Sequence, residues 1–82
     1  MTLLNIGFGN LLALERILSI LNPESSPVKR IVHASKENGN LIDATCGRKT
    51  QSVIIMDSGH IVTSSLSAEA RYIDGKRQIY FS

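Results

Sequence analysis

The middle of the chain alternates between apolar runs and short polar breaks, a pattern that predicts strands joined by turns. The β-prone runs are Leu41–Thr45, Thr50–Met56 and Ile61–Leu66. Each break contains a glycine, Gly47 in the first and Gly59 in the second, and glycine readily adopts the positive φ that a short hairpin turn needs. The pattern therefore predicts three antiparallel strands connected by two tight turns.

The second of these strands lacks the usual alternation. All residues from Val53 to Met56 are apolar, whereas a strand with one solvent-exposed face alternates apolar with polar residues. Both faces of this strand are therefore predicted to be buried. A helix can cover one face, but a chain of 82 residues is expected to lack a layer for the other. We expect a neighbouring subunit to supply that layer, so the pattern predicts self-association.

Helical periodicity is clearest over Val28–Asn38. Ser26 and Pro27 precede this segment as a predicted N-cap and first-turn proline, and Gly39 follows it as a predicted stop. One face of the helix is apolar or small, and the other is mostly basic: Lys29, Arg30, His33, Lys36 and Glu37. A basic face of this kind is typical of a solvated helix and is also compatible with a surface that faces DNA.

The N-terminal part of the chain leaves more than one interpretation open. Leu3–Phe8 is β-prone, and Gly7–Asn10 then interrupts it as a turn does. A dinucleotide-binding loop would need a further glycine where Leu12 stands, so a structural turn is favoured. Helix-favouring residues dominate Leu11–Leu21, but its second half, Ile17–Leu21, serves equally well as a buried strand.

The segment after Leu66 is also open to two interpretations. Ser67–Ala70 can begin a short helix, whereas Tyr72–Lys76 can form the turn of a hairpin. The residue pattern alone favours neither.

Composition narrows the class of protein. With 43% hydrophobic and 20% charged residues in 82 positions, the chain is expected to be one folded domain spanning residues 1–82. It has no apolar run approaching the roughly 18 residues that a membrane-spanning helix needs, so no membrane partner and a cytoplasmic location are expected. Because the net charge is only +2, the placement of the charges is more informative than their sum.

No group of residues indicates catalysis. The candidates for a nucleophile, a base or a paired acid are Cys46, His33, His60, Asp43 and Asp57. They do not form a recognisable set at catalytic or metal-ligand spacing. We therefore expect a protein that is not an enzyme and that has no cofactor or metal.

Adjacent cations at the first predicted turn are the clearest sign of a partner. Arg48 and Lys49 stand side by side there, where two cations and free turn amides can meet phosphates. Arg16 is a further candidate, although with Glu15 it can equally form a solvated corner. Two tyrosines and two phenylalanines, without tryptophan, are too few for a platform that stacks single-stranded bases. Contact with the backbone of double-stranded DNA is the favoured interpretation.

Three segments together resemble the bacterial RemA family: Asn5–Asn10 (NIGFGN), Asn22–Pro27 (NPESSP) and Leu41–Lys49 (LIDATCGRK). The resemblance extends over nearly all of Leu3–Leu66. It implies a small DNA-binding transcriptional regulator that assembles into a ring-shaped homo-oligomer and controls extracellular matrix genes in biofilm formation. It also implies that Ile17–Leu21 is a strand.

Carried over residue by residue, the resemblance implies DNA contacts at Arg16, Arg48 and Lys49. Lys49 stands where a member of the family carries arginine, which keeps the charge but loses the planar fork that binds phosphate in a bidentate way. The tail from about residue 67 looks unlike the C-terminal helix of the family.

The combined prediction is an α+β domain, a small antiparallel sheet with one main helix, assembled into a homo-oligomeric ring. Its expected partners are double-stranded DNA and further copies of itself, no small-molecule ligand is implied, and its expected place is the nucleoid. The alternative is an oligomeric scaffold that binds another protein through the tail Arg71–Phe81.

Overall fold

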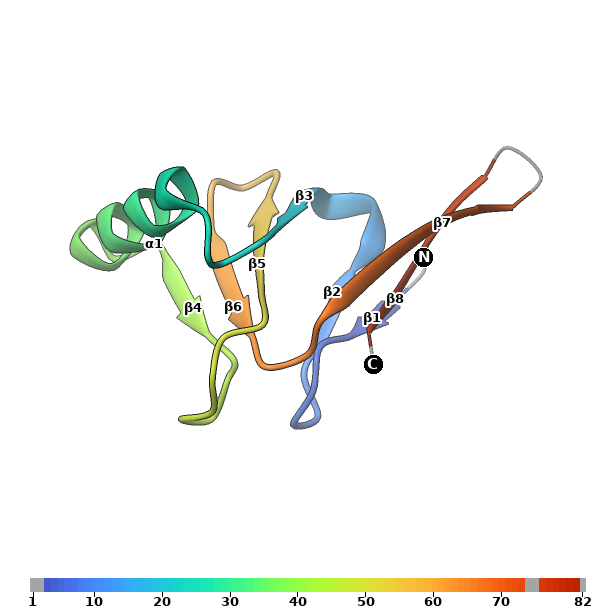
Figure 1. The fold of residues 1–82 in the computed structure, drawn as a ribbon, viewed down its shortest axis with the longest axis horizontal. Helices are drawn as coiled ribbons and strands as arrows, with labels where there is room; N and C mark the ends of the chain where they lie inside the picture. Colours follow the sequence, from blue (N-terminus) through green and yellow to red (C-terminus); the bar gives the residue numbers. More distant parts are fainter. Residues whose placement is uncertain (1–2, 74–75, 82) are drawn as a thin grey trace.

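The computed structural model describes residues 3–73 and 76–81, which form one α-helix, one short 3-10 helix and eight strands (Figure 1). This is an α+β arrangement with mostly antiparallel strand pairs, as predicted. In chain order the elements are β1 (Leu3–Asn5), β2 (Leu11–Ala13), η1 (Leu14–Arg16), β3 (Ile17–Leu21), α1 (Ser26–Asn38), β4 (Leu41–Asp43), β5 (Ser52–Met56), β6 (Ile61–Ser64), β7 (Ala68–Ile73) and β8 (Lys76–Phe81).

The central sheet has four strands in the order β3-β5-β6-β4. β5 pairs antiparallel with β3 and with β6, whereas β4 pairs parallel with β6. The predicted hairpin between Leu41–Thr45 and Thr50–Met56 is therefore wrong. β3 occupies the edge of β5 that a hairpin partner would need, so β4 joins the sheet at the other edge of β6. The second predicted turn is confirmed, because Asp57–His60 connects β5 to β6 and the Met56 amide donates to the His60 carbonyl oxygen at 3.0 Å.

The helix α1 lies against one face of this sheet (Figure 1). It connects β3 to β4, which run parallel at opposite edges, so the chain has to cross the face between them. The predicted helix is confirmed, although its N-cap is Ser25 rather than Ser26 because helical geometry begins one residue earlier. Gly39 ends the helix in the left-handed conformation at φ 76°, as predicted.

Both faces of β5 are buried within the chain, and Val53 and Ile54 each have 0% exposure. One cluster of buried residues lies on the helix side and a second lies on the opposite side of the sheet. The prediction that a neighbouring subunit must cover the second face is wrong, because the N-terminal strands β1 and β2 supply that layer. The helix-side cluster is Val28, Val53 and Ile61, and the opposite cluster is Leu4, Ile6, Ala44, Ile54 and Val62.

The N-terminal layer is a hairpin of β1 and β2 fastened to the central sheet. Gly7–Asn10 forms its turn, as predicted. Ser64 is fully buried in β6, and its Oγ donates to the carbonyl oxygen of Ile6 at 2.8 Å. Beyond the hairpin, Ile17–Leu21 forms β3, which confirms the strand that the family resemblance implied. Burial on the sheet outweighs the helix propensity of this segment, which is expressed only in the single turn η1.

The C-terminal strands β7 and β8 pair antiparallel. Of the two alternatives that the sequence left open, the hairpin is therefore confirmed. Residues 74 and 75, where its turn was predicted, lie outside the described residues.

Candidate nucleic-acid interface

The two predicted cations Arg48 and Lys49 lie on the loop of residues 44–51, which we call the basic loop. The Arg48 amide donates to the Thr45 carbonyl oxygen at 3.0 Å, which closes a turn around Cys46 and Gly47. Both central residues have positive φ, 51° and 80°, as a type I′ turn requires. The turn is thus centred one residue earlier than predicted, and it connects β4 to β5 across the sheet instead of closing a hairpin.

Asp43 anchors the start of the basic loop. Its Oδ1 atom accepts hydrogen bonds from the Thr45 amide at 3.0 Å, the Thr45 hydroxyl at 2.6 Å and the Thr63 hydroxyl at 3.0 Å. The side-chain and backbone hydrogen bonds from Thr45, with a smaller contribution from Thr63, lower the pKa of the Asp43 carboxyl in spite of the opposing effect of desolvation. A charged carboxylate therefore holds the loop to β6.

Replacing Asp43 by asparagine is expected to lower the free energy of unfolding at pH 7 by about 1 to 2 kcal/mol, because an amide oxygen is a weaker acceptor than a carboxylate. Folding lowers the pKa of Asp43. Its contribution to stability is therefore fully present above the unfolded pKa of about 3.9 and is lost as the pH falls through the lower, folded value. Urea unfolding of both proteins at pH 7 and at several pH values below 4 measures this difference.

The control for this prediction is Glu24→Gln, which neutralises an exposed carboxylate outside the Asp43 network. Its stability is expected to stay within about 0.5 kcal/mol of wild type at pH 7. Parallel stability curves for wild type and Asp43→Asn across the acid range would show that the carboxylate does not hold the loop.

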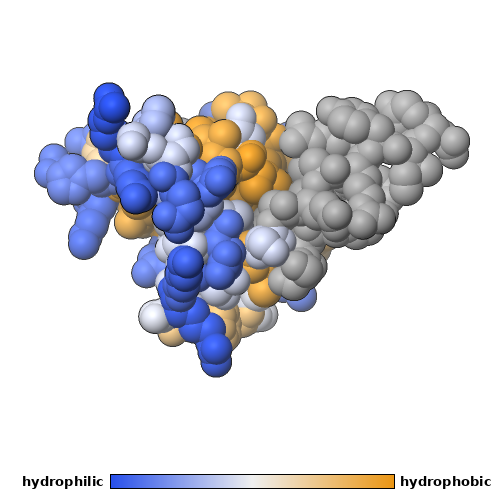
Figure 2. All heavy atoms as spheres, in the orientation of Figure 1, coloured by the Kyte–Doolittle hydropathy of each residue, from blue (hydrophilic) through white to orange (hydrophobic). Residues whose placement is uncertain are grey.

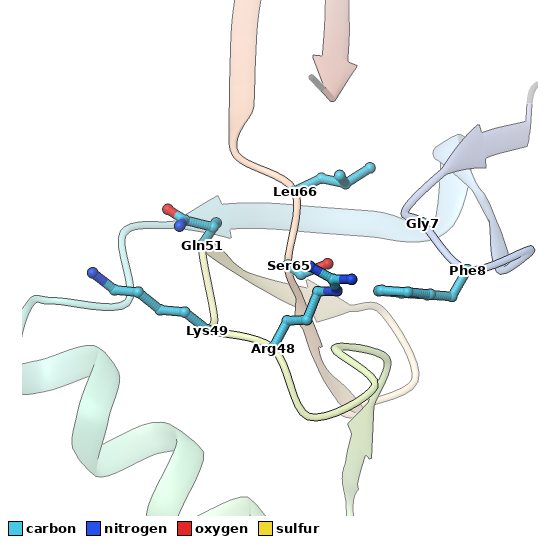
Figure 3. Close-up of a pocket in the computed structure, with 7 residues that line it drawn as sticks. All are labelled: Gly7, Phe8, Arg48, Lys49, Gln51, Ser65 and Leu66. Atoms are coloured by element: carbon cyan, nitrogen blue, oxygen red, sulfur yellow. The ribbon is translucent and has the colours of Figure 1, made fainter.

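Phe8 is a part of this surface that the sequence did not indicate. It lies in the turn between β1 and β2 with 51% exposure and φ 53°, a strained value for a residue other than glycine. The guanidinium carbon of Arg48 lies 5.7 Å from the centroid of its ring, within the range of a cation–π contact. Figure 3 shows the Arg48 side chain directed toward the ring, while Lys49 points away from it. In the sequence, the sign of this role was an aromatic residue placed between two glycines of a predicted turn.

A cavity of about 500 Å³ opens beside these side chains. The Gly7 backbone forms part of its wall at φ 97°, a conformation that favours glycine, and a Cβ atom there would make an ordinary contact with Leu66 Cγ at 3.4 Å. The cavity therefore joins the N-terminal turn to the basic loop. Its lining residues are Gly7, Phe8, Arg48, Lys49, Gln51, Ser65 and Leu66 (Figure 3).

Arg16, the third predicted DNA contact, lies apart from the basic loop in the structure. Its Nη1 atom pairs with Asp57 Oδ2 at 3.1 Å, and the two side chains are 70% and 37% exposed. The Asp57 amide also donates to the Arg16 carbonyl oxygen at 2.8 Å, which fixes Arg16 at the C-terminal end of β5. The basic loop enters β5 at the opposite end, roughly 13 Å away by the rise of a strand (Figure 1). One chain therefore does not bring Arg16 together with Arg48 and Lys49.

The candidate catalytic residues are also apart or engaged locally. His33 Nε2 pairs with Glu37 Oε1 at 2.9 Å on the helix, and His60 Nδ1 lies 2.8 Å from Ser58 Oγ in its turn. Cys46 is exposed in the basic loop. Among the described residues, no group of three or more His, Cys, Asp and Glu side chains is arranged to hold a metal ion. In the same part of the chain, no helix has both the length and the apolar character needed to cross a membrane.

Comparisons with known proteins connect this chain to regulators. A protein of Fervidobacterium nodosum is 50% identical over 80 residues, which covers 94% of this chain and 86% of that protein. Proteins of a Cyanothece species and of Thermosipho melanesiensis are 54% and 55% identical over 67 residues, covering 82% of this chain and 74% and 71% of those proteins. All three bear the name of candidate regulatory proteins, which supports a regulatory role in general terms.

The sequence model of one family matches most of the chain, from residue 3 to residue 71. That family is described as extracellular matrix regulatory protein A-like. The match includes the three segments on which the resemblance was based, and it includes β1 through most of β7. This chain is a member of the RemA-like family of extracellular matrix regulatory proteins.

Proposed function

We propose that this chain binds double-stranded DNA as a homo-oligomer and regulates the transcription of extracellular matrix genes, acting at the nucleoid. The observation that carries the proposal is the basic loop, which presents Arg48 and Lys49 on a base fixed by the Asp43 hydrogen bonds. Both side chains are exposed, and no carboxylate pairs with either of them within the described residues. Two unpaired cations on a fixed loop suit contact with phosphates.

Phe8 makes Arg48 a better phosphate ligand in this proposal. A guanidinium held near an aromatic ring keeps its N–H groups free at the edge of its plane, and a restrained side chain loses less conformational entropy on binding. Lys49 adds a second charge without the same directionality. The contact is made to the DNA backbone, with little readout of the bases.

Self-association is supported by the outer strands of the sheet, and not by the apolar run in β5 on which the sequence prediction was based. β3 and β4 are the outer strands of the central sheet, and each exposes a large apolar residue, Leu18 at 62% and Ile42 at 49%. Figure 2 shows an apolar patch in the region of β3, separate from the hydrophilic residues over α1. Contact between the β3 edge of one subunit and the β4 edge of the next uses two different surfaces. Such contacts form rings when the rotation closes.

An assembly also gives Arg16 a role. In one chain it lies at the far end of β5 from the basic loop, so it supplies a second, separate contact point to a duplex that passes several subunits. Repeated weak contacts then add up to strong binding. The exposed ion pair with Asp57 does not prevent this, because surface pairs are worth only about 0 to 1 kcal/mol.

The proposal is tested by the salt dependence of duplex binding, measured by fluorescence anisotropy. With two or three phosphates neutralised per subunit and about three subunits engaged, the slope of log K against log salt is expected to be roughly −5 to −8. Such a slope corresponds to a loss of affinity of about a thousandfold or more between 50 and 200 mM salt. A response close to flat would contradict backbone contact and would favour the protein-binding scaffold instead.

A further inference from the structure

A separate cavity of about 280 Å³ lies between α1 and the central sheet. The helix contributes one wall with Lys29, Val32, His33 and Lys36, which recur at helical spacing. Val53 and Thr63 of the sheet form the floor of the cavity, and both are buried, with 0% and 5% exposure. The lining is completed by Pro23 and Thr50.

The lining offers donors for an anion. Within the described residues, no carboxylate pairs with the ammonium groups of Lys29 and Lys36, and the Thr50 hydroxyl has no hydrogen-bond partner. Two carboxylates that contact lining residues are already engaged: Glu37 pairs with His33, and Asp43 accepts three hydrogen bonds, one of them from Thr63. The cavity therefore carries a surplus of positive charge beside an apolar floor.

We propose that this cavity binds a small phosphorylated metabolite through its phosphoryl group. Lys29 and Lys36 supply the charge, Thr50 donates a hydroxyl hydrogen bond, and the partly exposed aliphatic side chain of Val32 contacts the carbon skeleton. The volume lies just below the range of about 300 to 1,000 Å³ that is common for drug-sized ligands, so a sugar phosphate fits this size class better than a dinucleotide.

A compact ligand suits this cavity better than a phosphate of duplex DNA does. The floor residues are almost completely buried, and the lysines lie on the wall above them. A rigid duplex is too wide to enter a hollow of about 280 Å³ and can reach only its rim, whereas a small molecule can occupy the hollow itself.

Two residues of the lining connect this cavity to the basic loop. Thr50 follows Lys49 directly, and the Thr63 hydroxyl donates to the same Asp43 oxygen that holds Thr45. We infer that the bound metabolite changes the affinity of the basic loop for DNA, an inference that rests on the proposed function. The coupling is reciprocal, so DNA changes the affinity for the metabolite by the same factor.

Isothermal titration calorimetry with ribose 5-phosphate, and with ribose as the uncharged counterpart, tests the site directly. We expect saturable binding of ribose 5-phosphate and none of ribose. Lys29→Gln and Lys36→Gln are each expected to raise its Kd by about tenfold, the loss of one charge-assisted hydrogen bond. Arg30→Gln removes the same charge from an exposed position of the same helix that does not line the cavity, and it should change Kd by less than about twofold.

Several outcomes would overturn the proposal. One is the absence of saturable binding of ribose 5-phosphate at millimolar concentration in constant ionic strength. Another is an equal loss in all three variants, which would indicate general charge attraction. Absent metabolite binding together with weaker DNA binding in Lys29→Gln and Lys36→Gln would assign the cavity to a DNA phosphate.

The regulatory part has its own measurement, the Kd for duplex DNA with and without saturating ribose 5-phosphate. A change of about fivefold or more that disappears in Lys29→Gln supports it. An unchanged Kd overturns this part alone. If the chain fails to bind DNA at all, the calorimetry still decides whether the metabolite site exists.

Discussion

Replacing Arg48 by alanine is expected to weaken binding of duplex DNA by at least about a hundredfold at moderate salt. A single charge-assisted hydrogen bond contributes roughly 1.5 to 3 kcal/mol, which is a factor of ten or more. Because the proposed oligomer repeats the contact in every subunit, the loss is multiplied across those that engage one duplex. The salt slope should also become shallower by about 0.9 for each phosphate contact that is lost.

The measurement is anisotropy of a labelled duplex across a salt series, with circular dichroism and light scattering on the same samples. Arg30→Ala serves as the matched control, since it removes an exposed arginine from the helix, away from the basic loop. Its affinity should stay within about threefold of wild type. Equal affinities for Arg48→Ala and wild type, with the oligomer intact, would remove the basic loop from the interface.

Replacing Leu18 by glutamate is expected to dissociate the oligomer and to abolish DNA binding without any change in the basic residues. Leu18 is 62% exposed on the outer strand β3, so the free subunit tolerates the charge, whereas a contact with the next subunit would bury it. Burial of an unpaired carboxylate costs several kcal/mol. The repetition of contacts along DNA is lost together with the assembly.

Light scattering at micromolar concentration reports the mass of wild type, Leu18→Glu and Ile42→Glu. Both variants should shift toward the monomer, because the proposed contact uses one edge from each subunit. Ile31→Glu introduces the same charge at a 36% exposed position on α1, outside both edges, and should leave the mass unchanged. A wild-type monomer, or edge variants that assemble normally, would be incompatible with the proposed assembly.

Local pattern predicted most elements of the fold but not the partner of one strand. Hydrophobic periodicity and the positions of glycines predicted β5, β6, the turn between them and the helix α1. The positive φ of Cys46 and Gly47 was consistent with a hairpin, and only the pairing of β3 with β5 excludes one. Strand propensity does not specify which edge is already occupied, so this error is inherent in local reasoning.

The second layer of the core was missed for a related reason. Leu4 and Ile6 lie in a segment too short to read as a structural layer, yet together with Leu12 and Leu14 they pack against Ile54 and Val62. The candidate site was predicted in part. Arg48 and Lys49 were identified from charge and resemblance, whereas Phe8 joins them only through a contact between distant segments.

The bond between Ser64 and Ile6 has a consequence for biosynthesis. It joins residues 58 positions apart, and Leu4 and Ile6 of the N-terminal segment are buried in one cluster with Ala44, Ile54 and Val62 from the second half of the chain. While the ribosome makes the first half of the chain, Leu4 and Ile6 lack the buried residues Ala44, Ile54 and Val62 that complete their cluster. This cluster can close only after β6 has left the exit tunnel, so docking of the N-terminal hairpin is a late step, and fast docking limits the aggregation of nascent chains.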